Sequence, residues 1–258
     1  MEQKQRLAYS APPPLAGSAD GLDHLNDSEP TVRLEKQAQD IGATCQRARI
    51  LLDLINVGGM PASALLSAIT ELHSLDQEAV GWRQTSQWAY TSLNAMEHPH
   101  LLPSTQGITD TIQLHPDVWM AYEWNYHRTA RLIFLRQVLQ CARAALATPG
   151  LETTEDQALR DTASKCISTI QSLADEYLAT VPQSFGDVDH MGRPHDTSTG
   201  PPRCRAIGGY LLLWPTRTVR AESTPTTSEQ KERAARVFER IREYTGMKRL
   251  LGDRSNVI

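Results

Sequence analysis

The chain has 258 residues, a formal net charge of −4 and 40% hydrophobic residues, which is ordinary usage for a globular protein. A module that binds DNA by itself normally carries a basic surface, so the acidic balance argues against direct nucleic-acid binding. No apolar run approaches the roughly 20 residues that span a bilayer, and the N-terminus MEQKQRLAYS lacks the apolar segment of a signal peptide. We therefore expect a soluble, intracellular protein with no membrane partner.

The cysteines Cys45, Cys141, Cys166 and Cys204 are widely spaced and form no CxxC pair. A structural zinc site usually takes soft ligands in closely spaced pairs, so neither a metal nor another cofactor is expected. Three of these cysteines fall in segments predicted to be helical. They are predicted to be small buried hydrophobic residues of a protein in a reducing compartment.

Residues 1–30 are rich in Pro, Gly and Ser and hold few large apolar side chains, so we predict a disordered N-terminal segment. Apolar residues recur at spacings of three, four and seven over residues 31–56, which predicts an amphipathic helix. A second helix is predicted to begin at Pro61. Its expected apolar face consists of Leu65, Leu66, Ile69 and Leu72.

A shorter helix is predicted over residues 77–93, followed by a loop over residues 97–115 with at most a short helical turn. The longest periodic stretch runs from Pro116 to about Leu146 and is apolar on more than one side. It is therefore predicted to be the central helix of the fold.

Two further helices are predicted over residues 153–182 and 203–220, and a capping box of Thr226 and Glu229 predicts the start of a last helix. Adjacent glycines are unfavourable in a helix, so Gly208 and Gly209 suggest that another backbone approaches closely there. No alternating strand is found. The predicted fold class is all-α: a single domain over residues 31–258, with about seven helices around a long central helix.

Aromatic and ionisable residues gather at the start of the central helix, where they could line a ligand pocket. The candidate pocket residues are Trp119, Tyr122, Glu123, Trp124, His127 and Arg128. The alternative is that the aromatic rings are core and the charged groups form a solvated rim. No nucleophile elbow, dinucleotide fingerprint or phosphate-binding loop occurs, so no catalytic residue is assigned.

The loop over residues 186–196 combines carboxylates and imidazoles in the order Asp187, Asp189, His190, His195 and Asp196. Such a set could bind a metal or serve in acid–base catalysis. The interpretation we favour is structural: the aspartates cap turns or pair with Arg193 and Arg203, and His190 packs against the helices.

Four stretches together resemble the fungal-specific transcription factor domain that follows a six-cysteine binuclear zinc cluster in many regulators. They are DVWMAYEWNYHRTAR (residues 117–131), SFGDVDHMGRP (184–194), RCRAIGGYLLLWPTR (203–217) and VFERIREYTGMKRLL (237–251). The six-cysteine cluster itself is missing. The resemblance implies an all-α regulatory region that supports protein interactions and carries no accepted catalytic residues.

From this resemblance we expect a transcription factor-like regulatory protein without its own DNA-binding module. It would act by protein–protein contact in the nucleus or cytoplasm, in control of a fungal metabolic or secondary-metabolite gene cluster. The expected partner is a second copy or a full-length fungal transcription regulator. The alternative is a small-molecule-binding accessory protein or enzyme of a fungal biosynthetic pathway, built on the same helical domain.

The candidate interface is the last helix and its tail, because apolar residues continue to the end of the chain. These residues are Phe238, Ile241, Tyr244, Met247, Leu250, Leu251, Val257 and Ile258. Equally, the tail could fold back and complete the core.

Overall fold

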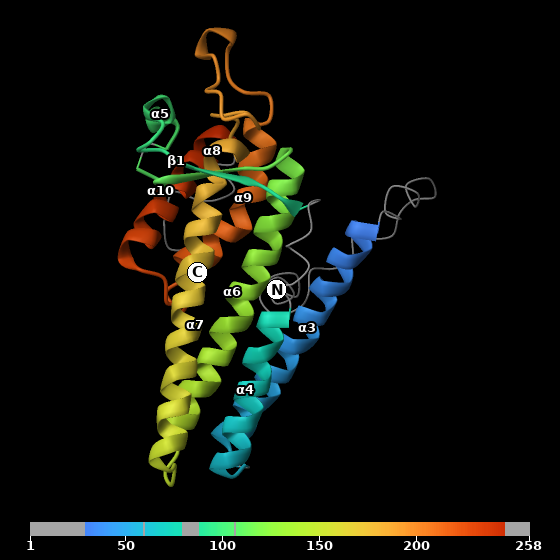
Figure 1. Cartoon of the computed structure of the whole chain (residues 1–258), viewed down its shortest axis with the longest axis vertical. Helices are drawn as coiled ribbons and strands as arrows, with labels where there is room; N and C mark the ends of the chain where they lie inside the picture. The colour runs from blue at the N-terminus through green and yellow to red at the C-terminus, as the bar shows by residue number, and fades with distance from the viewer. Residues whose placement is uncertain (1–28, 59, 79–87, 106, 246–258) are drawn as a thin grey trace. The chain divides into compact units, whose positions relative to one another are not determined.

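The structure is a computed structural model and describes residues 29–58, 60–78, 88–105 and 107–245. Helices dominate these ranges, and the predicted all-α fold class is confirmed (Figure 1). The long helices are α3 (Glu29–Asn56), α4 (Ala62–Glu78), α6 (Val118–Leu146), α7 (Thr153–Ala179), α9 (Arg205–Arg220) and α10 (Ser228–Tyr244). The short ones are η3 (Pro99–Leu101), α5 (Leu102–Thr105), α8 (Val181–Ser184) and η4 (Thr197–Thr199).

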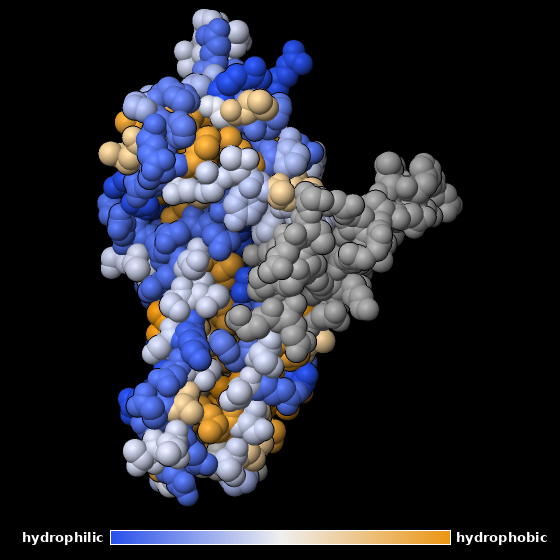
Figure 2. Space-filling model, viewed as in Figure 1, coloured by the Kyte–Doolittle hydropathy of each residue, from blue (hydrophilic) through white to orange (hydrophobic). Residues whose placement is uncertain are grey.

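The predicted disordered segment, residues 1–30, lies outside the described residues except for its last two, which begin α3. Among the described helices, none has the combination of length and apolar character needed to cross a membrane. In the space-filling view, hydrophobic residues come to the surface in small patches separated by hydrophilic ones (Figure 2).

The contacts of the chain group into two compact units, the first with residues 1–81 and 130–168 and the second with residues 82–129 and 169–258. Helices α6 and α7 each contribute residues to both units. The single domain expected over residues 31–258 stays a prediction, and each unit is described here by itself.

In the first unit, α3 and α4 pack against each other. Leu65, Ile69 and Leu72 are buried, as the helical spacing predicted, whereas Leu66 is only partly buried. A buried ion pair lies in the same unit: Arg131 Nε and one terminal nitrogen donate to the two carboxylate oxygens of Asp76, each at 2.6 Å. Since the guanidinium of Arg131 and the carboxylate of Asp76 are planar and face each other with two hydrogen bonds, the pair is well satisfied.

The second unit contains an antiparallel ribbon of β1 (Thr91–Asn94) and β2 (Thr111–Leu114). The expectation that no strand occurs is therefore wrong, and the helix predicted over residues 77–93 does not extend through Thr91. Strands of four residues are too short to show a convincing alternation in sequence. The ribbon packs by way of Ile112 and Leu114 into a small apolar cluster with Ala95, Leu101 and Val188.

On the edge of β2 that faces away from β1, side chains form hydrogen bonds with the backbone N–H and C=O groups. The Thr109 hydroxyl accepts from the Thr111 N–H at 3.2 Å and donates to the Thr111 carbonyl at 2.7 Å. The Gln183 carboxamide does the same for His115, accepting from its N–H at 2.7 Å and donating to its carbonyl at 2.6 Å. The ribbon is thereby fixed to α8, on which Gln183 lies.

Helices α9 and α10 pack along each other, and α9 also crosses α8 closely. A Cβ atom added to Gly208 would lie 1.7 Å from the carbonyl oxygen of Ser184, so the predicted close backbone approach is confirmed. The capping box of α10 is formed by Thr227 and Gln230, one residue later than predicted. Thr226 precedes the cap, and its hydroxyl donates to the carbonyl of Val219.

Candidate functional site

The candidate pocket residues of α6 lie on different faces of the helix. Trp119 is 54% exposed and Tyr122 half-buried, whereas Trp124 and His127 are buried and Arg128 is fully buried. Glu123 is half-buried, like Tyr122. Because 3.6 residues complete a turn, positions 119, 122 and 126 share one face and positions 124 and 128 another. The predicted single pocket is therefore divided into a surface and a buried cluster.

The exposed face belongs to what we call the α6–α9 aromatic surface, formed by Trp119, Tyr122, Tyr126, Tyr210 and Trp214. Four of these rings contact one another in sequence, with centroid distances of 6.4 Å from Trp119 to Tyr122, 6.0 Å from Tyr122 to Tyr126 and 5.3 Å from Tyr126 to Trp214. Tyr210, on α9, is 61% exposed. The sequence prediction missed Tyr210 and Trp214, although their spacing of four places them on one helical face.

The buried cluster is centred on the guanidinium of Arg128. Its nitrogens donate to Glu176 at 3.0 Å, to Asn125 at 3.1 Å and to Gln113 at 2.6 Å. The guanidinium carbon also lies 5.0 Å from the ring centroid of Trp124, within cation–π range. Burial lowers the pKa of Arg128, while the charge of Glu176 acts in the opposite direction.

His115 lies against the same cluster, with its ring centroid 5.1 Å from that of Tyr90 and 6.1 Å from that of Trp124. Neither ring nitrogen of His115 has a hydrogen-bond partner in the described part of the chain. Burial, and to a smaller extent the charge of Arg128, lowers its pKa to about 3. His115 is therefore neutral at physiological pH and contributes to packing.

A polar cleft of about 590 Å³ opens in the second unit where the β2 end of the ribbon meets α7 and α10. None of the six pocket residues predicted on α6 lines the cleft. Arg128 is connected to it indirectly, through hydrogen bonds to the lining residues Gln113 and Glu176. The lining residues are Thr109, Asp110, Thr111, Gln113, Gln171, Ser172, Asp175, Glu176, Ala179, Thr227, Glu229, Gln230 and Arg233. No local sequence pattern marks this cleft, because its walls come from three segments that are far apart in the chain.

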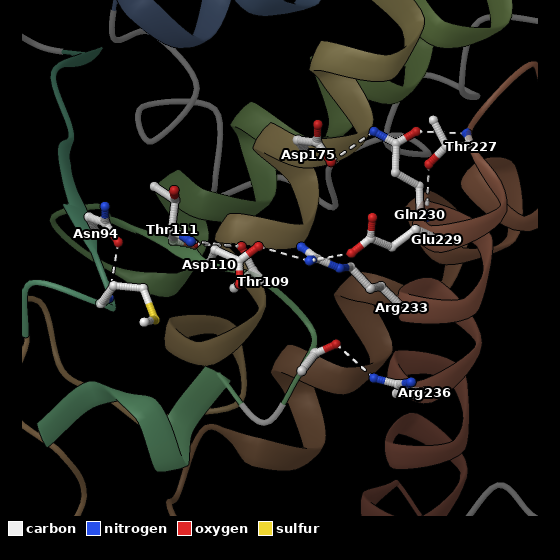
Figure 3. Close-up of polar contacts among 12 residues, drawn as sticks. Asn94, Thr109, Asp110, Thr111, Asp175, Thr227, Glu229, Gln230, Arg233 and Arg236 are labelled. Carbon is white, nitrogen blue, oxygen red and sulfur yellow. Dashed lines mark hydrogen bonds and ion pairs between the residues drawn. The ribbon is translucent and has the colours of Figure 1, made fainter. Parts of the chain in front are cut away.

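Polar contacts tie the walls of the cleft together (Figure 3). Arg233 of α10 donates to Asp110 at 2.8 Å and to Glu229 at 2.6 Å, so one guanidinium joins the ribbon to the helix. Gln230 donates to the Asp175 carboxylate and to the Gln171 carbonyl, both at 2.8 Å, which joins α10 to α7. These hydrogen bonds and ion pairs join the three segments that line the cleft.

The loop over residues 186–196 is held by ion pairs. Asp189 accepts from Arg193 at 2.7 Å, as the structural interpretation predicted. The predicted packing of His190 against the helices is wrong, because its side chain is exposed. Asp187 bonds Arg240 at 2.6 Å and lies 3.6 Å from Arg205, which replaces the predicted pairing with Arg203. Within the described ranges, no group of three or more His, Cys, Asp or Glu side chains is placed to hold a metal ion.

The cysteines predicted to be structural are buried, namely Cys45, Cys141 and Cys166. Burial raises the pKa of each of these thiols to about 12. Because the thiolate is the reactive form, none of them is a nucleophile at physiological pH.

The candidate interface on the last helix packs within the second unit. Ile241 is fully buried, Tyr244 contacts the Phe185 ring edge-on at 5.3 Å, and Arg220 covers the Phe238 ring at 4.5 Å. The remaining members of that candidate surface lie outside the described residues: Met247, Leu250, Leu251, Val257 and Ile258.

In comparisons with known proteins, no protein-family model, curated protein or solved structure matches the chain. The resemblance to the fungal-specific transcription factor domain therefore remains a prediction from the quoted residues.

Proposed function

We propose that the protein is a transcription factor-like regulatory protein that acts by binding another protein. The observation that carries this proposal is the α6–α9 aromatic surface, which leaves Trp119 and Tyr210 more than half exposed. Tyrosine and tryptophan are enriched in protein interfaces and at the positions that dominate their binding energy. Two of the four stretches that resemble the fungal regulatory domain, residues 117–131 and 203–217, supply this surface.

The proposed partner is a second helical regulator, either another copy of this chain or a full-length fungal transcription regulator that carries the DNA-binding module. An exposed aromatic surface with tyrosine hydroxyl groups suits a helix that presents both apolar and polar side chains. The net charge of −4 is consistent with a protein that reaches DNA only through such a partner.

The test is a reporter assay in which the chain is fused to an unrelated DNA-binding module. We expect the fusion to change transcription from the matching promoter, and the double substitution Trp119→Ser with Tyr210→Ser to reduce that change at least tenfold. Both residues are exposed, so the double variant should keep its thermal unfolding midpoint. The control substitution is Met191→Ser, on an exposed residue of the loop over residues 186–196, remote in sequence from the aromatic surface.

Deletion of the gene separates the proposed function from the enzyme alternative. A regulator should alter the transcripts of several neighbouring genes together. Loss of a single metabolic step, with accumulation of its precursor and unchanged transcripts, would show instead that the protein is an accessory protein or enzyme. Sequence-specific binding of purified protein to promoter fragments at physiological salt would also contradict the proposal.

A further inference from the structure

The exposed face of α9 is a row of apolar side chains that extends the α6–α9 aromatic surface. Ile207, Tyr210 and Trp214 recur at spacings of three and four, which places them on one side of the helix. Ile207 is 41% exposed and lies one turn before Tyr210, so it continues the surface toward the start of α9. Because the row covers about two turns and borders the aromatic rings of α6, its length suits the apolar face of one partner helix.

The charged residues of α9 and of the turn before it are all positive. This segment carries the four arginines Arg203, Arg205, Arg217 and Arg220, and no aspartate or glutamate. Arg205 lies 3.6 Å from the carboxylate of Asp187, and Arg220 lies over an aromatic ring of α10, so both guanidinium groups are engaged within the second unit. Arg203 and Arg217 are exposed, and neither side chain has an ion pair or a hydrogen bond among the residues that the structure describes.

The position of Arg203 is unfavourable for the fold itself. The free N–H groups at the start of a helix carry partial positive charge, so they repel a cation that lies just before α9. In the described part of the chain, no carboxylate lies within ion-pair distance of Arg203 to offset this repulsion. An anionic group on a partner would supply the compensation that the chain itself does not.

The acidic residues at the α6 border of the surface have contacts within the chain. Asp117 accepts from the N–H of Met120 at 2.8 Å and thereby caps the start of α6. Glu123 is half-buried and interacts within the chain. The two unpaired arginines of the α9 segment are therefore the charges that a helix lying along the apolar row would meet.

The same two arginines disfavour a second copy of this chain on the apolar row. If α9 packed antiparallel to the α9 of another copy, Arg203 of each chain would lie near Arg217 of the other. In a parallel pair, each arginine would lie near its own counterpart. Both arrangements bring like charges together at both ends of the row, which lowers affinity, whereas carboxylates on a different helix would meet both arginines favourably.

We propose that the α6–α9 aromatic surface binds an acidic amphipathic helix of a different protein, whose carboxylates pair with Arg203 and Arg217. This binding mode rests on the regulatory function proposed above, and of its two partners it selects the one that is not a second copy. The arginines are about 20 Å apart along the helix axis, so the matching carboxylates lie about four turns apart. At an exposed rim, such ion pairs determine the choice of partner and the rate of association, while the aromatic side chains supply most of the affinity.

Fluorescence anisotropy with designed peptides and the full-length chain tests the proposal. Two labelled helical peptides of about 20 residues share one face of leucine and phenylalanine and carry either glutamate or lysine beside that face. We expect the glutamate peptide to bind about tenfold more tightly than the lysine peptide, and its affinity to fall as salt is added. Failure of both peptides to bind, equal binding of the two, or binding of anionic phospholipid vesicles in preference to either would overturn the proposal.

A reversal of charge locates the contact. Arg203→Glu combined with Arg217→Glu should make the lysine peptide the tighter ligand, a result that loss of folding cannot produce. Arg143→Glu combined with Lys165→Glu is the matched control, because it changes the net charge equally at exposed residues of the first unit. An unchanged preference after reversal at the two α9 arginines, or the same reversal in the control, would show that these arginines do not select the partner.

Light scattering and the reporter assay distinguish a failure of this proposal from a failure of the proposed function. We expect the wild-type chain to be monomeric at micromolar concentration. A dimer that Trp119→Ser with Tyr210→Ser abolishes would show that a second copy occupies the surface, which overturns the acidic partner but not the regulatory function. An inactive fusion in the reporter assay would instead contradict the regulatory function, while the peptide preference would still show what the surface binds.

Discussion

At the scale of single residues, the second unit buries an imidazole that has no hydrogen-bond partner among the described residues. The pKa of His115 is lowered to about 3 from an ordinary value of 6.5, first by burial and then by Arg128. Between these two pH values the unfolded chain binds a proton at this position that the folded chain does not. The contribution of neutral His115 to the free energy of unfolding is therefore present in full above pH 6.5 and is lost as pH falls toward 3.

We predict that His115→Phe removes this contribution. In urea unfolding, the wild-type free energy of unfolding should fall more steeply with decreasing pH than that of the variant, by up to about 1.4 kcal/mol per pH unit. His190→Asn, at an exposed histidine, should keep the wild-type slope. Parallel slopes for wild type and His115→Phe would show that the imidazole titrates normally in the folded protein.

The buried ion pair of the first unit gives a prediction of a different kind. Asp76→Ala leaves the Arg131 guanidinium buried without its carboxylate, and such losses cost about 3–5 kcal/mol. The free energy of unfolding, measured in urea, should fall by that amount. Asp156→Ala, which removes the exposed ion pair with Arg160 on α7, should change it far less. Equal effects of the two substitutions would mean that Asp76 is not buried in the protein.

At the scale of elements, the crossing of α8 and α9 depends on one missing side chain. A methyl group at Gly208 would overlap the Ser184 carbonyl oxygen, a backbone atom that cannot move without displacing α8. We predict that Gly208→Ala lowers the thermal unfolding midpoint by more than 10 °C or prevents folding. Gly209→Ala would contact the Thr245 methyl group at 2.9 Å, and a side chain can shift, so its effect should be smaller. A wild-type midpoint for Gly208→Ala would contradict the close approach.

At the scale of the whole molecule, the long helices were predictable because their apolar residues repeat over many turns. For example, Leu65, Ile69 and Leu72 are buried as their spacing predicted. The ribbon was not predictable, since four-residue strands such as Thr111–Leu114 give too short a pattern and depend on pairing with a distant segment. The start of α10 was missed by one residue, because two adjacent threonines, Thr226 and Thr227, are both good capping residues and the local pattern does not choose between them.

The candidate site was predictable only in part. Helical periodicity alone places Trp119 and Tyr122 on a different face of α6 from Trp124 and Arg128. Applied to the predicted pocket, it would have separated the exposed aromatic residues from the buried cluster. The cleft required the fold, because Asp110, Asp175 and Arg233 are far apart in sequence and meet only through packing. No local pattern marks any of them.

The side chains along the outer edge of β2 have a consequence for behaviour at high concentration. Strand addition by a neighbouring molecule needs several successive open N–H and C=O groups, and here the Thr109 hydroxyl and the Gln183 carboxamide already occupy those of Thr111 and His115. A strand of another molecule therefore cannot form these backbone hydrogen bonds with Thr111 or His115. The side chains of a threonine and a glutamine thus protect this edge from intermolecular β-sheet formation, a role that charged residues or prolines often have in other proteins.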